Sequence, residues 1–141
     1  MELLTLAGLD SLDWKPRHYV QGPDGTRYGY DKAVDPRYEF PGMAVDFVRL
    51  KSGLIIPEHY HRKGAENFVV LGGRALFQTR GSTAEERREQ EVSSRDMLRI
   101  NPGERHRVVN LSDEPFYLWR HAMKEPDDSV FTEYPELFEA L

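Results

Sequence analysis

Residues 53–73 read GLIIPEHYHRKGAENFVVLGG and hold two of the five histidines of the chain, His59 and His61, with one residue between them. We expect the segment around this pair to be a β-strand. Because side chains on a strand alternate between its two faces, the imidazoles of His59 and His61 point to the same face and lie close together. A metal ion can bridge two imidazoles placed in this way.

A polar turn and a second predicted strand follow the two histidines. Residues 62–65 have the composition of a tight connection, and residues 68–71, Phe-Val-Val-Leu, predict a strand that returns beside the first. Glu66 shares a face with Phe68 and Val70, and one choice of register places its carboxylate beside the two imidazoles. The segment is therefore predicted to be a hairpin that carries three ligands.

A second stretch, residues 95–110, supplies a fourth ligand. Met97 to Ile100 predicts a short strand, residues 101–103 (Asn-Pro-Gly) predict a turn, and His106 opens another strand. Nitrogen and oxygen ligands without thiolate suit Fe(II), Mn(II), Ni(II), Zn(II) or Cu(II) at an open, reactive site.

The composition narrows the class of protein. A chain of 141 residues with 39% hydrophobic residues fits one folded domain. A net charge of −5 argues against nucleic-acid binding, and the absence of cysteine excludes disulfides and thiolate ligation. No apolar run reaches the length of a membrane span, and the N-terminus does not resemble a signal peptide. We expect a cytoplasmic protein without a membrane partner.

Short predicted strands with turns between them indicate an all-β fold, either an antiparallel barrel or a two-sheet jelly roll. Residues 1–40 are rich in glycine and proline and are predicted to be an N-terminal arm with short strands, packed on the barrel. Residues 41–124 form the predicted barrel. Residues 125–141 are predicted to be an acidic tail with a short helix that begins near Pro135.

Two predicted barrel strands carry further candidate residues. On residues 43–51, Val45, Phe47 and Arg49 share one face, while Ala44, Asp46, Val48 and Leu50 share the other. Arg49 here, and Arg120 on the strand from Phe116 to Met123, each interrupt an apolar face. An inward arginine would bind a substrate carboxylate or phosphate, whereas most strand arginines cover the outside of a sheet.

The strand from Phe116 to Met123 carries three aromatic side chains, Tyr117, Trp119 and His121, for which two roles are considered. His121 lies on the same face as Tyr117 and Trp119. If this face points inward, His121 is a candidate general acid or base, and Tyr117 and Trp119 are candidate walls of the substrate cavity. If it points outward, His121 is a surface or dimer residue and the two rings are packing residues.

The two motifs resemble those of the cupin superfamily. Its first motif is met at every position by Gly53, His59, His61, Glu66 and Gly73, and its second is matched by Asp96, Gly103, His106 and Asn110. Two turn positions depart from the second motif. Arg95 stands where a glycine is usual, and Asn101 stands where a proline is usual.

The resemblance implies a cupin-type antiparallel β-barrel, a double-stranded jelly roll, that holds one divalent metal ion on His59, His61, Glu66 and His106. Such a site leaves about two coordination positions open and has a net charge near +1, which favours an anionic or chelating small-molecule substrate. Many cupins of this size are dimers, so we expect a homodimer.

Three functions follow from this resemblance. The leading hypothesis is an Fe(II)-dependent oxygenase, a dioxygenase-type oxidoreductase, in which Glu66 has a second role as proton acceptor. The alternative is a non-redox isomerase, cyclase or lyase in which the metal ion stabilises an enolate. The third is a cupin that binds a small ligand without catalysis.

Overall fold

The computed structural model describes residues 4–5, 7–35, 40–81, 86–123 and 129–138. Within them it consists mainly of strands, which confirms the predicted all-β class. Neither helix in these ranges is long and apolar enough to cross a membrane. The elements in chain order are η1 (Ala7–Ser11), β1 (Lys15–Gln21), β2 (Arg27–Ala33), β3 (Met43–Leu50), β4 (Ile55–His61), β5 (Glu66–Gly72), β6 (Arg74–Arg80), β7 (Arg88–Ser93), β8 (Met97–Ile100), β9 (Arg105–Asn110), β10 (Phe116–Met123), β11 (Ser129–Phe131) and α1 (Pro135–Phe138).

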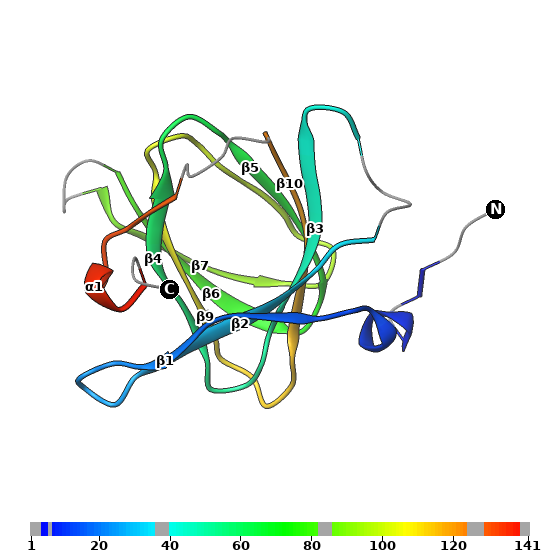
Figure 1. The fold of residues 1–141 in the computed structure, drawn as a ribbon, viewed down its shortest axis with the longest axis horizontal. Coiled ribbons are helices and arrows are strands. Elements are labelled where there is room, and N and C mark those ends of the chain that lie inside the picture. Colours follow the sequence, from blue (N-terminus) through cyan, green and yellow to red (C-terminus); the bar gives the residue numbers. More distant parts are fainter. Residues whose placement is uncertain (1–3, 6, 36–39, 82–85, 124–128, 139–141) are drawn as a thin grey trace.

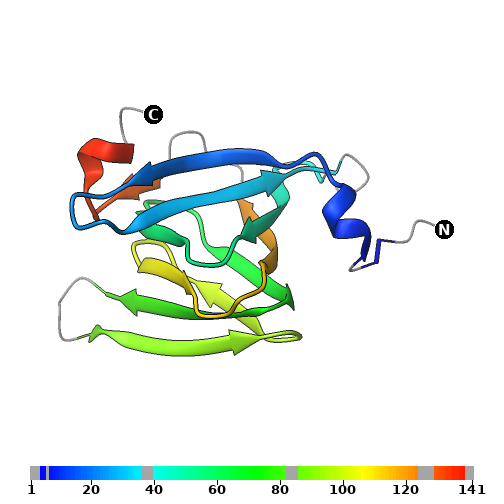
Figure 2. The ribbon, with the colours of Figure 1, turned by 90° about the horizontal axis from the view of Figure 1, so that it is seen from below.

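The strands form a single sheet that curls around an enclosed interior (Figure 1). The strand order is β7-β6-β9-β4-β2-β3-β10-β5-β8, with β1 paired to β2 and β11 paired to β4. The hairpin of β1 and β2 lies on one side of the molecule, and β6 and β7 lie on the opposite side (Figure 2). This arrangement is the predicted jelly-roll barrel.

Two details of the strand pairing differ from the sequence-based expectation. The predicted hairpin of residues 53–73 is wrong, because β4 pairs with β9, β2 and β11, whereas β5 pairs with β10 and β8. The connection between β4 and β5 therefore joins strands that are not neighbours. In addition, β2 is not part of an arm laid on the barrel but a strand of the sheet itself, between β4 and β3.

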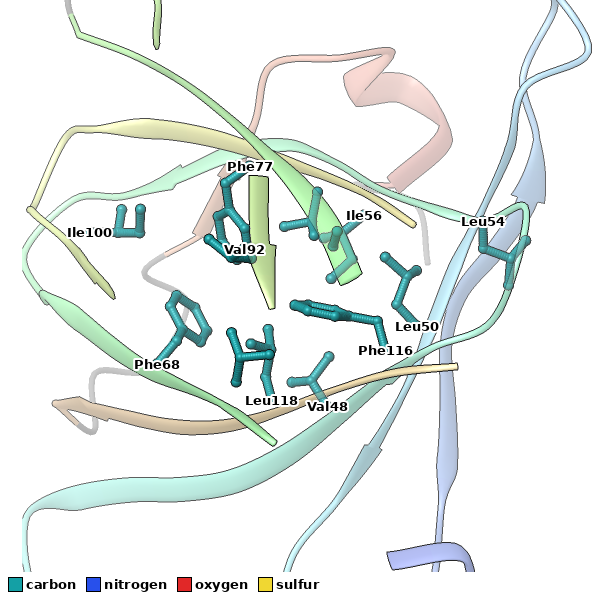
Figure 3. Close-up of a cluster of buried hydrophobic side chains, with 13 residues drawn as sticks. Val48, Leu50, Leu54, Ile56, Phe68, Phe77, Val92, Ile100, Phe116 and Leu118 are labelled. Carbon is teal, nitrogen blue, oxygen red and sulfur yellow. The ribbon is translucent and has the colours of Figure 1, made fainter. Parts of the chain in front are cut away.

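The interior is filled by apolar side chains from alternate positions of the strands. Thirteen buried residues form this cluster, and those from facing walls meet in the middle, with the ring of Phe116 between them (Figure 3). Val48 and Leu50 of β3 belong to it, so the face of that strand that carries them is the inward one. Full burial of a valine, leucine or phenylalanine side chain stabilises the fold by about 1.5–3 kcal/mol.

A second, smaller cluster covers the outer face of the sheet. Leu9 of η1, Ala33 of β2 and Phe47 of β3 are its buried members. Trp14, Tyr117 and Trp119 pack against it. The segment before β1 therefore shields part of the outside of the barrel.

A β-bulge in β4 separates the apolar core from the polar end of the barrel. Ile56 pairs with Val108 and His59 pairs with His106, so three steps along β4 match two steps along β9. The extra residue shifts the alternation of side chains by one place. As a result Ile56 joins the core, and His59 also faces the interior although it is three residues further on.

The turn before β8 contains an unusual backbone conformation. Arg95, at the position where the resemblance expects glycine, has a φ of 79°. Its amide donates to the Val70 carbonyl at 3.0 Å, and the amide of Ser93 donates to the Asp96 carboxylate at 2.8 Å. A residue other than glycine is destabilised in this left-handed region, so the turn keeps Arg95 in a strained backbone conformation.

We expect Arg95→Gly to raise the free energy of unfolding by about 0.5–1 kcal/mol, because relief of the left-handed strain exceeds the added entropy of the unfolded chain. Urea denaturation of wild type and variant would measure the change. Arg95→Ala is the matched control, since it removes the same side chain and keeps the strain. A gain of equal size in both variants, or a loss in Arg95→Gly, would contradict this account.

Candidate metal centre

Four side chains with metal-ligating atoms converge at the polar end of the interior. They are His59 and His61 from β4, Glu66 at the start of β5, and His106 from β9, and one ligand atom of each lies within 4.8 Å of all the others. In the part of the chain that the structure describes, no other histidine or carboxylate group of this kind occurs. The four residues are those assigned by sequence reasoning.

These four residues reach one point from different walls of the barrel. His59 and His106 are direct neighbours in the pairing of β4 with β9. The ring centroids of His59 and His61 lie 5.3 Å apart, as alternation on one strand predicts. Glu66 comes from β5, which is not hydrogen-bonded to either of those strands. The jelly roll thus places the carboxylate beside the imidazoles across the interior, without the predicted hairpin.

Hydrogen bonds at Nδ1 fix the orientation of the three rings. Nδ1 of His59 lies 2.8 Å from the Pro57 carbonyl oxygen, and Nδ1 of His106 lies 3.3 Å from the Glu104 carbonyl oxygen. A carbonyl can only accept, so Nδ1 carries the hydrogen in both rings and Nε2 keeps its lone pair. Nδ1 of His61 lies 3.2 Å from Oγ of Ser129. Burial, with His106 nearby, holds the pKa of His59 well below its usual value, which keeps that ring neutral.

The Glu66 carboxylate completes the donor set and is 3% exposed. Its Oε1 lies 2.7 Å from Nε2 of His61 and 3.1 Å from Nε2 of His106. Among the described residues, neither this oxygen nor Nε2 of His61 has a hydrogen-bond partner of suitable geometry.

Unpartnered buried polar atoms are costly, and a cation between the four residues would satisfy both Oε1 of Glu66 and Nε2 of His61. Three imidazole nitrogens and one carboxylate oxygen suit a divalent first-row metal ion. The residues present therefore fit the ion that the resemblance implies.

A row of alternating charges crosses four adjacent strands and ends at Glu66; we refer to Lys32, Asp46, Arg120 and Glu66 as the charge ladder. These side chains belong to β2, β3, β10 and β5 in spatial order. Nζ of Lys32 lies 3.2 Å from Asp46, and Arg120 donates from Nε and Nη2 to the two oxygens of Asp46 at 2.8 and 2.7 Å. Nη1 of Arg120 donates to Oε2 of Glu66 at 2.8 Å.

The charge ladder gives Arg120 a role different from the predicted one. Three of its N–H groups are directed at carboxylates of the protein, so its guanidinium orients Glu66 and does not stand free for a substrate. Burial alone would lower the pKa of Arg120, but Asp46 and Glu66 raise it, so the charge is permanent. With Oε2 of Glu66 held by Arg120, Oε1 is the oxygen left to a metal ion.

Sequence reasoning did not assign Lys32 or Asp46 to the site, although one signal was present. Asp46 lies on the same face of β3 as Val48 and Leu50, and that face is the interior. It is 2% exposed. A carboxylate on a buried face needs a cationic partner, which would have pointed to an inward arginine or lysine on a neighbouring strand.

The C-terminal segment also contributes to the site. In β11, Ser129 pairs with His61 and Phe131 pairs with His59. The ring centroids of Phe131 and His59 lie 5.5 Å apart. Glu133 fixes the segment on the barrel, because its carboxylate accepts from the Glu58 amide at 3.0 Å, Arg107 Nε at 2.9 Å and the Tyr28 hydroxyl at 2.5 Å. The C-terminal segment therefore lines the site next to His59 and His61.

The structure does not bring His121, Tyr117 and Trp119 into the site. On β10 the inward position belongs to Arg120, so the residues on either side of it point outward. The rings of Trp119 and His121 stack edge to face with centroids 4.3 Å apart, and the hydroxyl of Tyr117 donates to Asp10. The inward placement considered for His121 as an acid or base, and for the two rings as cavity walls, is therefore not found.

Arg49 also lies outside the interior. It shares the outer face of β3 with Phe47, donates from Nε to Asp31 at 2.9 Å and lies 4.6 Å over the ring of Trp14. Its predicted contact with a substrate at the metal centre does not agree with this position.

Comparison with known proteins places this fold and site in a family. The sequence profile of the cupin domain matches residues 46–119, more than half of the chain. No curated protein matches the chain significantly.

Similar solved structures include three cupin-like folds. The capsular polysaccharide assembling protein CapF from Staphylococcus aureus has a TM-score of 0.63 at 23% identity, over 74% of this chain and 32% of that chain. Oxalate decarboxylase from Bacillus subtilis, described with Mn(II) centers, has a TM-score of 0.62 at 18% identity, over 73% and 27%. An uncharacterized conserved protein with a double-stranded beta-helix domain from Klebsiella pneumoniae has a TM-score of 0.60 at 20% identity, over 82% and 91%.

The chain spans about a third or less of the CapF and oxalate decarboxylase chains, and at these identities the likeness shows the fold alone. The family rests on the profile match together with the barrel that carries it. The chain therefore belongs to the cupin family.

Proposed function

We propose that the protein is a mononuclear metal enzyme that acts on a small anionic or chelating substrate. His59, His61, Glu66 and His106 would hold one divalent ion. The observation that carries the proposal is the orientation of the rings. The Nδ1 contacts of His59 and His106 leave the lone pair of Nε2 in each ring available to a metal ion. Such an ion would act as a Lewis acid or redox centre with open coordination positions for substrate.

We favour an Fe(II)-dependent oxygenase among the metal enzymes. Support comes from the donor set of three imidazoles and one carboxylate, which contains no thiolate, and from the burial of Glu66 and His106. Within this proposal Arg120 orients Glu66, and the Nδ1 contacts orient the histidines. Because Oε2 of Glu66 accepts from Arg120, its position favours the role of ligand over the second role of proton acceptor.

A non-redox isomerase, cyclase or lyase is the second candidate. Arg120 contacts the proposed ligand Glu66, and Lys32 lies further along the same charge ladder. Cations stabilise the negative charge of an enolate. Oxalate decarboxylase, whose fold this chain shares, is described with Mn(II) centers, so manganese is a candidate ion beside iron. Nickel, zinc and copper remain candidates by the same donor set.

Oxygen uptake separates the candidates. The protein is loaded anaerobically with Fe(II), exposed to nitric oxide for electron paramagnetic resonance, and then mixed with small hydroxy and keto acids in an oxygen electrode. A nitrosyl signal and substrate-dependent oxygen uptake are expected. Turnover without oxygen uptake, detected by mass spectrometry or nuclear magnetic resonance, would instead support the non-redox enzyme, and ligand binding without any turnover would support a binding protein.

The expectation of a cytoplasmic homodimer also remains a proposal. A groove of about 370 Å³ on the outer face is lined by residues that include Val69, Met97 and Trp119, and Met97 is 78% exposed. Such an apolar surface is suited to burial against a second copy of the chain. Light scattering at micromolar concentration should give the mass of a dimer, and a monomer alone would remove this expectation.

A further inference from the structure

Lys32 lies in the interior but outside the part of the chain that the cupin profile matches. Its strand, β2, precedes residues 46–119. Tyr30, two residues earlier and on the same face, packs against the interior core cluster. Nζ of Lys32 reaches Asp46, which Arg120 joins to Glu66. Lys32 is therefore the end of the charge ladder that lies farthest from the proposed ion.

The charge ladder is balanced without a metal ion. Its two cations, Lys32 and Arg120, cancel the two carboxylates of Asp46 and Glu66. A divalent ion on the four ligands would therefore bring positive charge that none of these side chains compensates, and uncompensated charge in a buried site is costly. A bound molecule with two negative charges would restore the balance.

Lys32 is the member of the ladder that can meet such a molecule. Its side chain is 30% exposed, against 14% for Arg120 and 3% for Asp46. An ammonium group has three N–H donors, and among the described residues the ion pair with Asp46 occupies one of them. Asp46 itself is already bound at both oxygens by Arg120, so it does not depend on Lys32 for a partner.

We propose that Lys32 binds the second anionic group of a small dianionic substrate whose first anionic group binds at the metal centre. The inference rests on the proposed metal function and deepens it by naming the substrate class. Lys32 is then a specificity-determining residue that distinguishes diacids from monoacids. The hydrogen bond between its ammonium and a carboxylate or phosphate oxygen is charge-assisted at both ends.

The test uses the whole chain loaded with Zn(II), which has no redox chemistry. Affinities are measured by isothermal titration calorimetry at constant ionic strength. The probes are pairs of equal chain length: malonate and propionate, succinate and butyrate, glutarate and valerate. We expect at least one dicarboxylate to bind about 10–100-fold tighter than its monocarboxylate, the range for a hydrogen bond between charged groups. Lys32→Met should remove this preference, and Lys32→Arg should keep it.

Zinc content is measured in every sample as the loading control, and the second variant Lys32→Gln should lose the dicarboxylate preference as Lys32→Met does. The proposal is overturned if wild type binds the two members of every pair equally, or if the preference survives in both variants. A wild-type protein that takes up no zinc would instead overturn the proposed metal function. The two failures are therefore distinguishable.

Discussion

His106→Ala is expected to abolish tight metal binding while the chain stays folded. His106 is 2% exposed and supplies one of four ligand atoms, with its ring fixed by the Glu104 carbonyl. Loss of a residue that merely supports a ligand costs about 10–100-fold in metal affinity, so loss of a ligand should cost more than about 100-fold. Titration with Mn(II) or Zn(II) under a competing chelator would measure the change.

His121→Ala is the matched control for this experiment. It removes a histidine of the same barrel from the outer face, where His121 stacks on Trp119. Its metal affinity should equal that of wild type, and circular dichroism should show that both variants are folded. Equal metal affinity of His106→Ala and wild type would remove His106 from the ligand set.

Arg120→Met is expected to have the largest effect on stability. The substitution leaves the carboxylate of Asp46 with Lys32 as its remaining ion-pair partner in the described structure, and it frees Oε2 of Glu66. Removal of one partner from a buried ion pair costs about 3–5 kcal/mol, because the other charge stays buried. Glu66 would also lose its orientation, so metal affinity should fall by about 10–100-fold.

Urea denaturation and metal titration together test this prediction. Arg99→Met is a suitable control, since Arg99 lies exposed on the edge strand β8 and donates to Asn101. Exposed substitutions of this kind change the free energy of unfolding by about 0.5 kcal/mol or less. If Arg120→Met were as mild as Arg99→Met in both measurements, the charge ladder would have no role in holding Glu66.

The alternation of side chains allowed much of this structure to be predicted from the sequence. It placed His59 and His61 on one face, and it separated the core face of β3, with Val48 and Leu50, from the outer face with Phe47. Alternation predicts which residues of a strand share a face, but it does not predict which strands are neighbours in the sheet. For that reason β4 and β5 were predicted to pair, although the barrel inserts other strands between them.

The errors at the site have related causes. On β10 the predicted alternation was right, but the sequence pattern did not determine which face points inward. Arg120 faces the interior, where it donates hydrogen bonds to the buried carboxylate of Asp46 on β3. The bulge between Ile56 and His59 has no signal in the residue pattern. The strand β11 has three residues, too few for a period to be recognised, so its contact with the site could not be foreseen.

We expect His59, His61, Glu66 and His106 to hold one divalent metal ion. The metal content of untagged protein purified under anaerobic conditions can be measured by elemental mass spectrometry. About one divalent metal ion per chain is expected, and it should remain bound after dialysis against buffer without chelator. Protein that contains no metal and takes up none of Fe(II), Mn(II), Ni(II) or Zn(II) on titration would contradict this expectation.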